Sequence, residues 1–184
     1  ETTYNNTDLV TIDGWPIQNA IKGHTGIISM QEVLTYSLNT GSIQALRLLG
    51  GSETEITYQG KEKLYDYYYN RFGLGKYTGI ELAESKGTVI PPTDIDGTNA
   101  RYANMTFGQS LDLTMIQVAT AFSAVVNGGD YYTPTLVAGE IKNGEFVRDV
   151  LKDRDHQAIE ASTSETMRKM LHTARLVFPN VKYY

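Results

Sequence analysis

The chain has 184 residues, of which 41% are hydrophobic and 20% are charged, a composition typical of a folded globular domain. Its formal net charge of -5 argues against a nucleic-acid partner, because phosphate binding requires a basic face. No apolar run approaches the roughly 20 residues that cross a bilayer. The absence of cysteine excludes disulfides and thiolate chemistry.

The three histidines, His24, His156 and His172, do not have the spacing of metal ligands such as HExxH. We therefore expect no metal and no other cofactor.

In chain order, residues 1–27 are rich in Thr, Asn, Gly and Asp and predict extended or looped chain, with a turn at 13–14. Ser29 and Glu32 then match the capping-box pattern, in which each side chain satisfies a free backbone donor. This pattern predicts a helix over 30–36.

After an interruption at 37–41, apolar residues over 43–49 predict a second helix, beginning near residue 41 and ending at a glycine pair. A shared apolar face predicts a third helix over 60–72. The glycine-rich stretch 73–92 that follows predicts turns and loop.

Two further capping boxes, S/T-x-x-E/Q, predict helices over 114–127 and 162–176. Between them, residues 135–151 alternate around Asn143-Gly144, the strongest short-range signal for a β-hairpin. The sequence thus predicts an α+β chain that is mainly helical, with one hairpin and no linker dividing residues 1–184.

Ser37 and Asn39, in the interruption between the first two helices, form an S-x-N motif. This short motif occurs often by chance. One interpretation is that Asn39 caps the second helix, because Asn and Ser are favoured there. The other is that both side chains face a substrate. On the motif alone, both interpretations stay open.

Three other patterns favour structure over chemistry. The glycines of 73–79 fit neither the dinucleotide pattern nor a P-loop. Asp94 and Asp96 lie too close along one loop for a glycosidase pair and are expected to be turn residues. Four tyrosines are expected to pack rather than to stack on bases, because no basic groove accompanies them: Tyr65, Tyr67, Tyr68 and Tyr69.

The order of the longer motifs adds a resemblance. The successive segments are TIDGWPIQNA (11–20), SMQEVLTYSLNTGSIQAL (29–46), FGLGKYTGIELAESKG (72–87), MTFGQSLDLTMIQVATAFSAVVNGG (105–129) and YYTPTLV (131–137). Together they resemble the transpeptidase domain of class B penicillin-binding proteins, the bacterial cell-wall cross-linking enzymes. The resemblance covers about residues 4–137 well and the remainder more loosely.

The resemblance implies the helical part of a serine β-lactamase-like fold. It also implies a role for both residues of the motif, with Ser37 as a catalytic proton-relay hydroxyl and Asn39 as the amide that binds substrate and steadies a lysine. In the family, a serine of S-x-x-K is acylated by D-Ala-D-Ala stem peptides or by β-lactams, and a K-[TS]-G strand holds the substrate carboxylate. The logic is that of a hydroxyl nucleophile activated by a nearby base.

The sequence departs from this pattern, because none of its nine serines has a lysine three residues later and K-[TS]-G is absent. In the family these motifs would lie before residue 1 and after residue 184. We therefore expect one partial transpeptidase domain over 1–184, cut from a membrane-anchored parent on the extracytoplasmic face of the cytoplasmic membrane. The piece alone is expected to be soluble and inactive.

For the parent, the resemblance implies stem peptides and β-lactams as ligands and division or elongation proteins as partners. The alternative from another class is a non-catalytic, transpeptidase-like interaction module. A β-lactam sensor and a serine β-lactamase share the S-x-N logic, but the TGIEL and NGG blocks favour a class B synthase.

Overall fold

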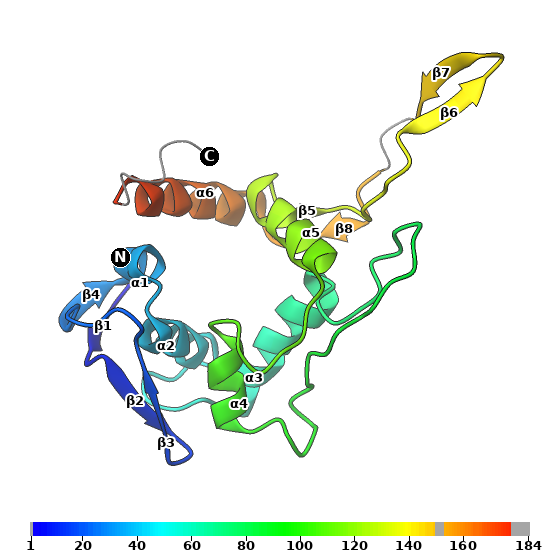
Figure 1. Cartoon of the computed structure of the whole chain (residues 1–184). Coiled ribbons are helices and arrows are strands. Elements are labelled where there is room, and N and C mark those ends of the chain that lie inside the picture. The colour runs from blue at the N-terminus through cyan, green and yellow to red at the C-terminus, as the bar shows by residue number, and fades with distance from the viewer. Residues whose placement is uncertain (1, 150–152, 178–184) are drawn as a thin grey trace. The chain divides into compact units, whose positions relative to one another are not determined.

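The computed structural model describes residues 2–149 and 153–177 (Figure 1). This part of the chain divides into two compact units. Unit 1 comprises residues 2–66, 90–111 and 166–177, and unit 2 comprises residues 67–89, 112–149 and 153–165. The mixed helical and strand content confirms the predicted α+β, mainly helical class.

Four short strands of unit 1 form two antiparallel pairs. β1 (Thr3–Asn6) pairs with β4 (Gly26–Ser29), and β2 (Leu9–Ile12) pairs with β3 (Trp15–Gln18). The turn between β2 and β3 is the predicted one, with φ of 50° at Asp13 and 83° at Gly14. Such a pair of positive φ values is the conformation that tight hairpins require.

The helices of unit 1 are α1 (Met30–Tyr36), α2 (Asn39–Leu49), α3 (Tyr58–Tyr65) and α4 (Asn99–Met105). The capping box of α1 is confirmed, because Glu32 N donates to Ser29 Oγ and Ser29 N donates to the Glu32 carboxylate at 2.8 Å. The second helix begins two residues before its predicted start. The short helix α4 was not predicted.

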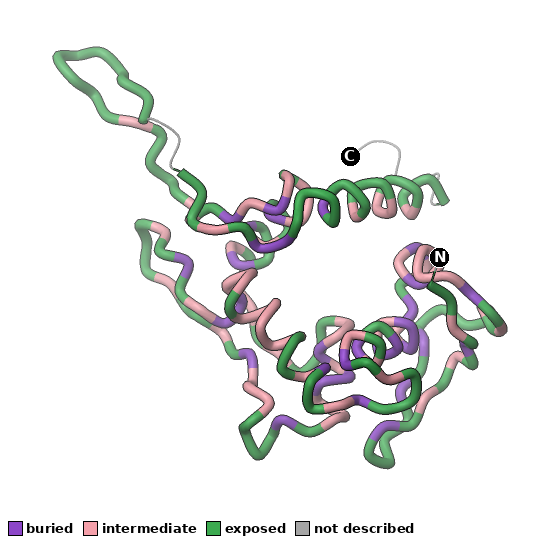
Figure 2. The backbone as a smooth tube through the Cα atoms, turned by 180° about the vertical axis from the view of Figure 1, so that it is seen from behind, coloured by how far each residue is buried: buried purple, intermediate pink, exposed green. Residues whose placement is uncertain are grey.

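The core of unit 1 forms where α1 meets α2. Ile28, Val33 and Leu38 are buried together, and partly buried side chains pack around them: Tyr4, Met30 and Tyr36. Ile43 and Leu46 of α2 are also buried, and Figure 2 shows the purple, buried segments gathering around this helix. The helix thereby fixes the residues that precede it.

Unit 2 contains one long helix, a π-helical turn and four short strands. They are η1 (Asp66–Arg71), α5 (Met115–Val126), β5 (Asp130–Tyr131), β6 (Gly139–Lys142), β7 (Glu145–Arg148) and β8 (His156–Gln157). The predicted helix over 60–72 is thus α3 followed directly by η1. The predicted capping box of α5 is present, with Thr114 as N-cap and Gln117 closing it.

The predicted hairpin around Asn143-Gly144 is confirmed as β6 paired with β7. Residues 150 and 151, at the end of its predicted range, lie outside the described residues. In the second ladder, β5 pairs with β8. Tyr131 packs there in a small core with Ala124 and Ala158.

The predicted capping box at Ser162 is wrong, because α6 (Ala161–Leu176) begins before it and encloses it. Ser164 has a different task in the first turn of this helix. Its buried hydroxyl donates to Val125 O at 2.7 Å and accepts from Gly128 N at 3.1 Å. It therefore satisfies main-chain groups that α5 leaves free where it ends.

Gln117 holds the glycine-rich loop of unit 2 from inside. Its side chain is 1% exposed, and its amide nitrogen donates to Lys76 O and to Lys86 O, the latter at 2.8 Å. Its oxygen accepts from Gly75 N at 3.4 Å and from Thr114 N at 3.2 Å. One amide thus fastens the two ends of the loop to the start of α5.

Candidate active site

Ser37 ends α1 in the left-handed conformation, with φ of 52° and ψ of 53°. Its main-chain N–H donates to Val33 O, which closes the helix, while its side chain is exposed. The hydroxyl has no hydrogen-bond partner among residues 2–149 and 153–177. A non-glycine residue pays about 1–2 kcal/mol for this conformation, so the fold holds Ser37 in place at a cost.

Asn39 is the first residue of α2. The N-cap of this helix is Leu38, which is fully buried and makes no side-chain cap hydrogen bond, so the interpretation of Asn39 as the cap is wrong. Instead, Asn39 Nδ2 donates to Gln18 O of β3 at 2.8 Å. A carbonyl only accepts, which fixes the amide orientation and leaves Oδ1 as an available acceptor.

A buried polar network holds the start of α2 where a cap would otherwise act. Asn19 Oδ1 accepts from Thr40 N at 3.0 Å, and Thr40 Oγ1 donates to Asn6 Oδ1 at 2.8 Å. The Tyr4 hydroxyl lies 3.1 Å from Thr40 Oγ1 and must donate to it, because the single Thr40 hydrogen is already used. The Asn19 amide therefore replaces the missing side-chain cap, and Asn6 of β1 holds the Thr40 hydroxyl.

Asp8 anchors the outer edge of this network. Its carboxylate accepts from Asn19 Nδ2 at 2.8 Å, from Asn6 Nδ2 at 3.2 Å and from Gly23 N at 2.7 Å. These hydrogen bonds, first that from Asn19 and then that from Gly23, hold the pKa of Asp8 below its ordinary value. The loop that carries Gly23 is thereby tied to β1.

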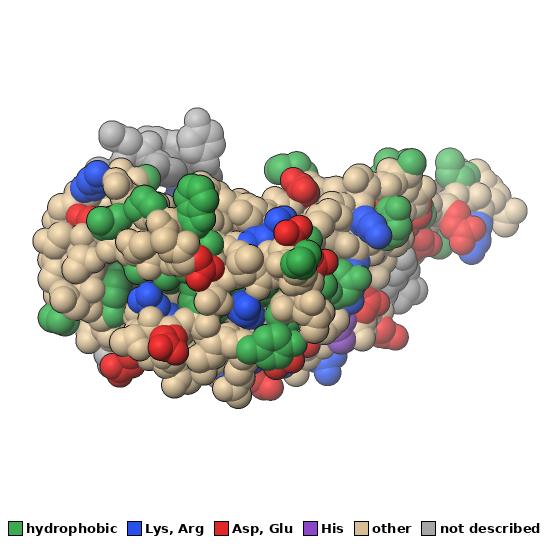
Figure 3. Space-filling view, turned by 90° about the horizontal axis from the view of Figure 1, so that it is seen from below, with side chains coloured by type: hydrophobic (Ala, Val, Ile, Leu, Met, Phe, Trp, Pro, Cys, Tyr) green, Lys and Arg blue, Asp and Glu red, His purple; other side chains and the backbone are tan. Residues whose placement is uncertain are grey.

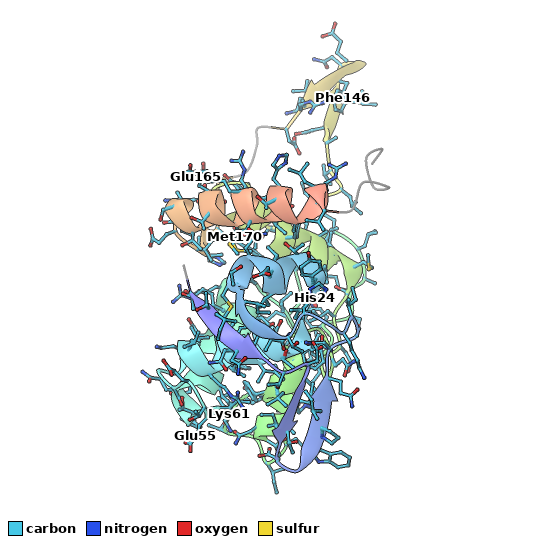
Figure 4. The ribbon with its side chains drawn as sticks, turned by 90° about the vertical axis from the view of Figure 1, so that its left-hand side faces the viewer. His24, Glu55, Lys61, Phe146, Glu165 and Met170 are labelled. Carbon is cyan, nitrogen blue, oxygen red and sulfur yellow. The ribbon has the colours of Figure 1, made fainter. Side chains whose placement is uncertain are left out.

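The ring of Tyr36, the residue before Ser37, is held by a stacking contact. His24 stacks on Tyr36, with ring centroids 3.7 Å apart and an interplanar angle of 25°, and Figure 4 labels His24 near α1. Farther along unit 1, Gln31 of α1 donates to Met170 O of α6 at 3.0 Å. Both ends of α1 are therefore fixed by neighbours.

Gly41 allows α1 and α2 to meet closely behind the S-x-N segment. A Cβ at this position would lie 2.3 Å from Val33 Cγ2 and 2.9 Å from the Tyr4 hydroxyl. Gly41, the second residue after Asn39, therefore has no room for a side chain. This close approach sets the sharp corner on which Ser37 and Asn39 lie.

The other sequence candidates have structural roles. Asp94 Oδ1 accepts from Asp96 N at 2.9 Å within an exposed turn, as predicted for turn residues. The four clustered tyrosines are partly buried along α3 and η1, and Tyr67 contacts Phe72 with ring centroids 6.4 Å apart. The face in Figure 3 carries acidic and basic side chains interspersed.

Within 2–149 and 153–177 no group of three or more His, Asp or Glu side chains could hold a metal ion. In the same ranges, no helix has the length and apolar character to cross a membrane. The side chains of the motif itself are a hydroxyl and an amide.

The order of the sequence motifs resembles that of one known family, and a match to a family model shows that the chain is a member. The model of the penicillin-binding protein transpeptidase domain matches residues 1–176. The chain belongs to this family. Its fold is accordingly that of the penicillin-binding protein transpeptidase domain.

Individual members agree with this assignment. Stage V sporulation protein D of Bacillus subtilis is 34% identical over 165 residues, which cover 88% of this chain and 24% of the relative. Penicillin-binding protein PbpB of Mycobacterium tuberculosis is 29% identical over 112 residues, 61% of this chain and 16% of that protein. The chain thus spans a quarter or less of these relatives.

The fold has counterparts among solved structures. The crystal structure of penicillin-binding protein 3 from Mycobacterium tuberculosis, complexed with aztreonam, superposes with a TM-score of 0.73 at 23% identity. The match covers 94% of this transpeptidase-domain chain and 36% of that structure. This likeness concerns the fold.

The S-x-N motif is visible in the sequence, but the buried side chains that hold it in position are not. Asn6, Asn19 and Thr40 are buried polar residues with exposures of 1%, 2% and 6%. Polar residues in a Thr- and Asn-rich segment are typical of loops, and no period marks them as buried. Only the long-range pairing of β1 and β3 with α2 gives them a shared role.

Proposed function

We propose that this chain is part of a peptidoglycan D,D-transpeptidase, a penicillin-binding protein that cross-links cell-wall stem peptides. The reaction passes through an acyl-enzyme: a serine oxygen attacks the D-Ala-D-Ala carbonyl, and the terminal D-Ala leaves. β-Lactams acylate the same serine. Membership of the transpeptidase family and the S-x-N motif support this function.

The observation that carries the proposal is the state of the Ser37 hydroxyl. The side chain is exposed in a left-handed conformation and has no hydrogen-bond partner in the described chain, although the backbone around it is fixed from both sides. If residue 37 only had to end the helix in the left-handed conformation, glycine would be favoured at this position. A serine retained at this cost supports the role of proton relay during acylation.

Asn39 fits the role of a substrate-binding amide. Its nitrogen is occupied by Gln18 O, so its oxygen faces incoming donors such as a substrate N–H or a lysine ammonium. Because the amide cannot flip without losing that bond, its acceptor is pre-organised. Ser37 and Asn39 are the residues that we assign to the site.

The 184 residues hold neither S-x-x-K nor K-[TS]-G, so we propose that they do not form an acyl-enzyme by themselves. In the whole protein these motifs would supply the nucleophile, its base and the carboxylate-binding strand. We place that protein on the extracytoplasmic face of the bacterial cytoplasmic membrane, with stem peptides and β-lactams as ligands. Division or elongation proteins are its proposed partners.

The test uses a fluorescent penicillin on two proteins: the 184-residue chain, and the protein encoded by the same gene with its natural flanking sequence on both sides. We expect covalent labelling of the longer protein and none of the shorter one. In the longer protein, Ser37→Ala should slow acylation at least 10-fold, because one positioned proton-transfer group typically contributes 10²–10⁴-fold. Ser123→Ala, at an exposed position of α5, is the matched control.

Two results would overturn the proposal. An unchanged acylation rate in Ser37→Ala would return Ser37 to a purely structural role. Absence of labelling in the longer protein, when folded, would favour the non-catalytic interaction module.

A further inference from the structure

A pocket of about 270 Å³ lies in unit 1 and shares no residue with the S-x-N motif. One wall is the β2–β3 hairpin, and the other is α4 with the loops on either side of it. Its lining residues are Trp15, Asp96, Thr98, Ala100, Arg101, Asn104 and Ser110. None of them has a place in the transpeptidase chemistry described above.

A hydrogen bond from the main chain of one wall to a side chain of the other holds the two walls together. Asp13 Oδ2, in the turn of the hairpin, accepts from Ala100 N at 2.8 Å. Thr98 caps α4 by accepting from Arg101 N at 3.2 Å. The Asp13 carboxylate thus joins the two walls, and the Thr98 hydroxyl fixes the start of α4.

Two opposite charges line this pocket without pairing. Neither the Arg101 guanidinium nor the Asp96 carboxylate has a hydrogen-bond or ion-pair partner in residues 2–149 and 153–177. Arg101 Nε is moreover shielded from solvent with no acceptor to meet it. Because Nε is out of reach of solvent, the terminal nitrogens of the guanidinium, which stay accessible, are the donors that a ligand in this pocket can meet.

The pocket also has an apolar wall and uncharged polar groups. Trp15 is the only tryptophan of the chain and is 69% exposed although it borders a pocket. The hydroxyls of Thr98 and Ser110 can donate, and Asn104 Oδ1 can accept, because Asn104 already donates to Ala100 O at 2.9 Å. An exposed indole beside convergent polar groups is typical of a ligand site.

We propose that this pocket binds a free amino acid or a dipeptide as a zwitterion. The ligand carboxylate meets the Arg101 guanidinium, its ammonium meets Asp96, and its side chain covers the Trp15 ring. A simple anion fits less well because Asp96 would repel it. The volume lies below the ~300–1,000 Å³ of pockets for drug-sized ligands, as suits a molecule of this size.

The single tryptophan makes the test direct. The 184-residue chain is excited at a wavelength that selects tryptophan and titrated with the dipeptide Ala-Phe carrying free termini. We expect a saturable blue shift of the emission as Trp15 is covered. N-acetyl-Ala-Phe and Ala-Phe amide, each lacking one charge, should bind at least 10-fold more weakly.

Variants of the two charged residues test which end of the ligand each of them binds. Arg101→Gln should weaken Ala-Phe at least 10-fold and remove the penalty of the amidated ligand, whereas Asp96→Asn should remove the penalty of the acetylated one. Arg148→Gln, an exposed position in β7, is the control for lost positive charge. Circular dichroism establishes that each variant is folded.

Three outcomes would overturn the proposal. The first is a tryptophan emission that does not change when Ala-Phe is added. The second is an unchanged affinity for Ala-Phe in both Arg101→Gln and Asp96→Asn. The third is an equal emission shift with sulfate, which would make the pocket an anion site only. None of them bears on Ser37 or on acylation, so the proposed transpeptidase function is tested separately.

Discussion

Thr40 is the residue on which the geometry of the S-x-N segment depends most directly. It is 6% exposed, its N–H is bound by Asn19 and its hydroxyl joins Tyr4 to Asn6. Strands that precede α1 and the helix that follows Ser37 meet at this one side chain. The position of Asn39, the residue before Thr40, is thereby fixed.

Thr40→Val tests this anchoring. The valine keeps the shape of the side chain but removes its hydrogen bonds. The Asn6 amide oxygen keeps Asp8 N and Asn19 Nδ2 as donors, whereas the Tyr4 hydroxyl loses its acceptor, so we expect a loss of about 1 kcal/mol in the free energy of unfolding. Urea denaturation measures it. Thr11→Val, on an exposed position of β2, should change the same quantity by less than about 0.5 kcal/mol. Equal effects of the two variants would contradict a network role for Thr40.

At the scale of elements, the glycine-rich loop of unit 2 is ordered by two side chains rather than by regular structure. Gln117 fastens its ends, and Glu84 folds its middle by accepting from Thr78 N at 2.7 Å, Thr78 Oγ1 at 2.6 Å and Gly79 N at 2.9 Å. These hydrogen bonds, that from the Thr78 hydroxyl first, lower the pKa of Glu84 from its ordinary value of 4.5. The loop therefore depends on an ionised carboxylate.

The lowered pKa gives this loop a defined pH dependence. Glu84 stabilises the folded chain fully above its unfolded pKa of about 4.5, and this contribution disappears as the pH falls through the lower folded pKa. Glu84→Gln should thus melt below the natural chain at pH 7, and the two melting temperatures should converge as the pH falls through the lowered pKa of Glu84. Calorimetry over this range measures it, with the exposed Glu145→Gln as control. A difference that stays constant with pH would contradict the assignment.

The elements also show what sequence can and cannot predict. The capping boxes of α1 and α5 and the Asn143-Gly144 hairpin were predicted correctly, because each is encoded in neighbouring residues. The helix over 162–176 was also predicted correctly, but its capping box was not, because α6 begins one residue earlier and Ser162 lies inside the helix rather than at its N-cap. Ser37 and Asn39 were visible as a motif, while their supporting network depended on tertiary pairing.

Across the whole molecule, burial is distributed very unevenly. The strands β6 and β7 are exposed almost throughout, with Ile141 at 75% and Phe146 at 59%, as the green hairpin in Figure 2 shows. The ladder of β5 and β8, by contrast, carries Tyr131, which is 8% exposed. Stability should therefore arise from α2, α5 and the β5–β8 ladder, with the hairpin adding little.

Excising the hairpin measures this difference. Replacing residues 139–148 by a four-residue Gly-Ser linker keeps the flanking hydrogen bond of Asp149 N to Ala138 O, 3.1 Å long, which shows that the two ends already meet. A two-stranded hairpin without cover is marginal in water, so its removal should shift the melting temperature by less than about 2 °C.

Tyr131→Ala provides the contrast, since it empties the core formed with Ala124 and Ala158. At about 3–5 kcal/mol for a large aromatic residue and roughly 2–4 °C per kcal/mol for a chain of this size, it should lower the melting temperature by about 10 °C. If excision cost as much as Tyr131→Ala, the hairpin would have to be packed against the remainder of unit 2. Its exposed side chains argue that it is not.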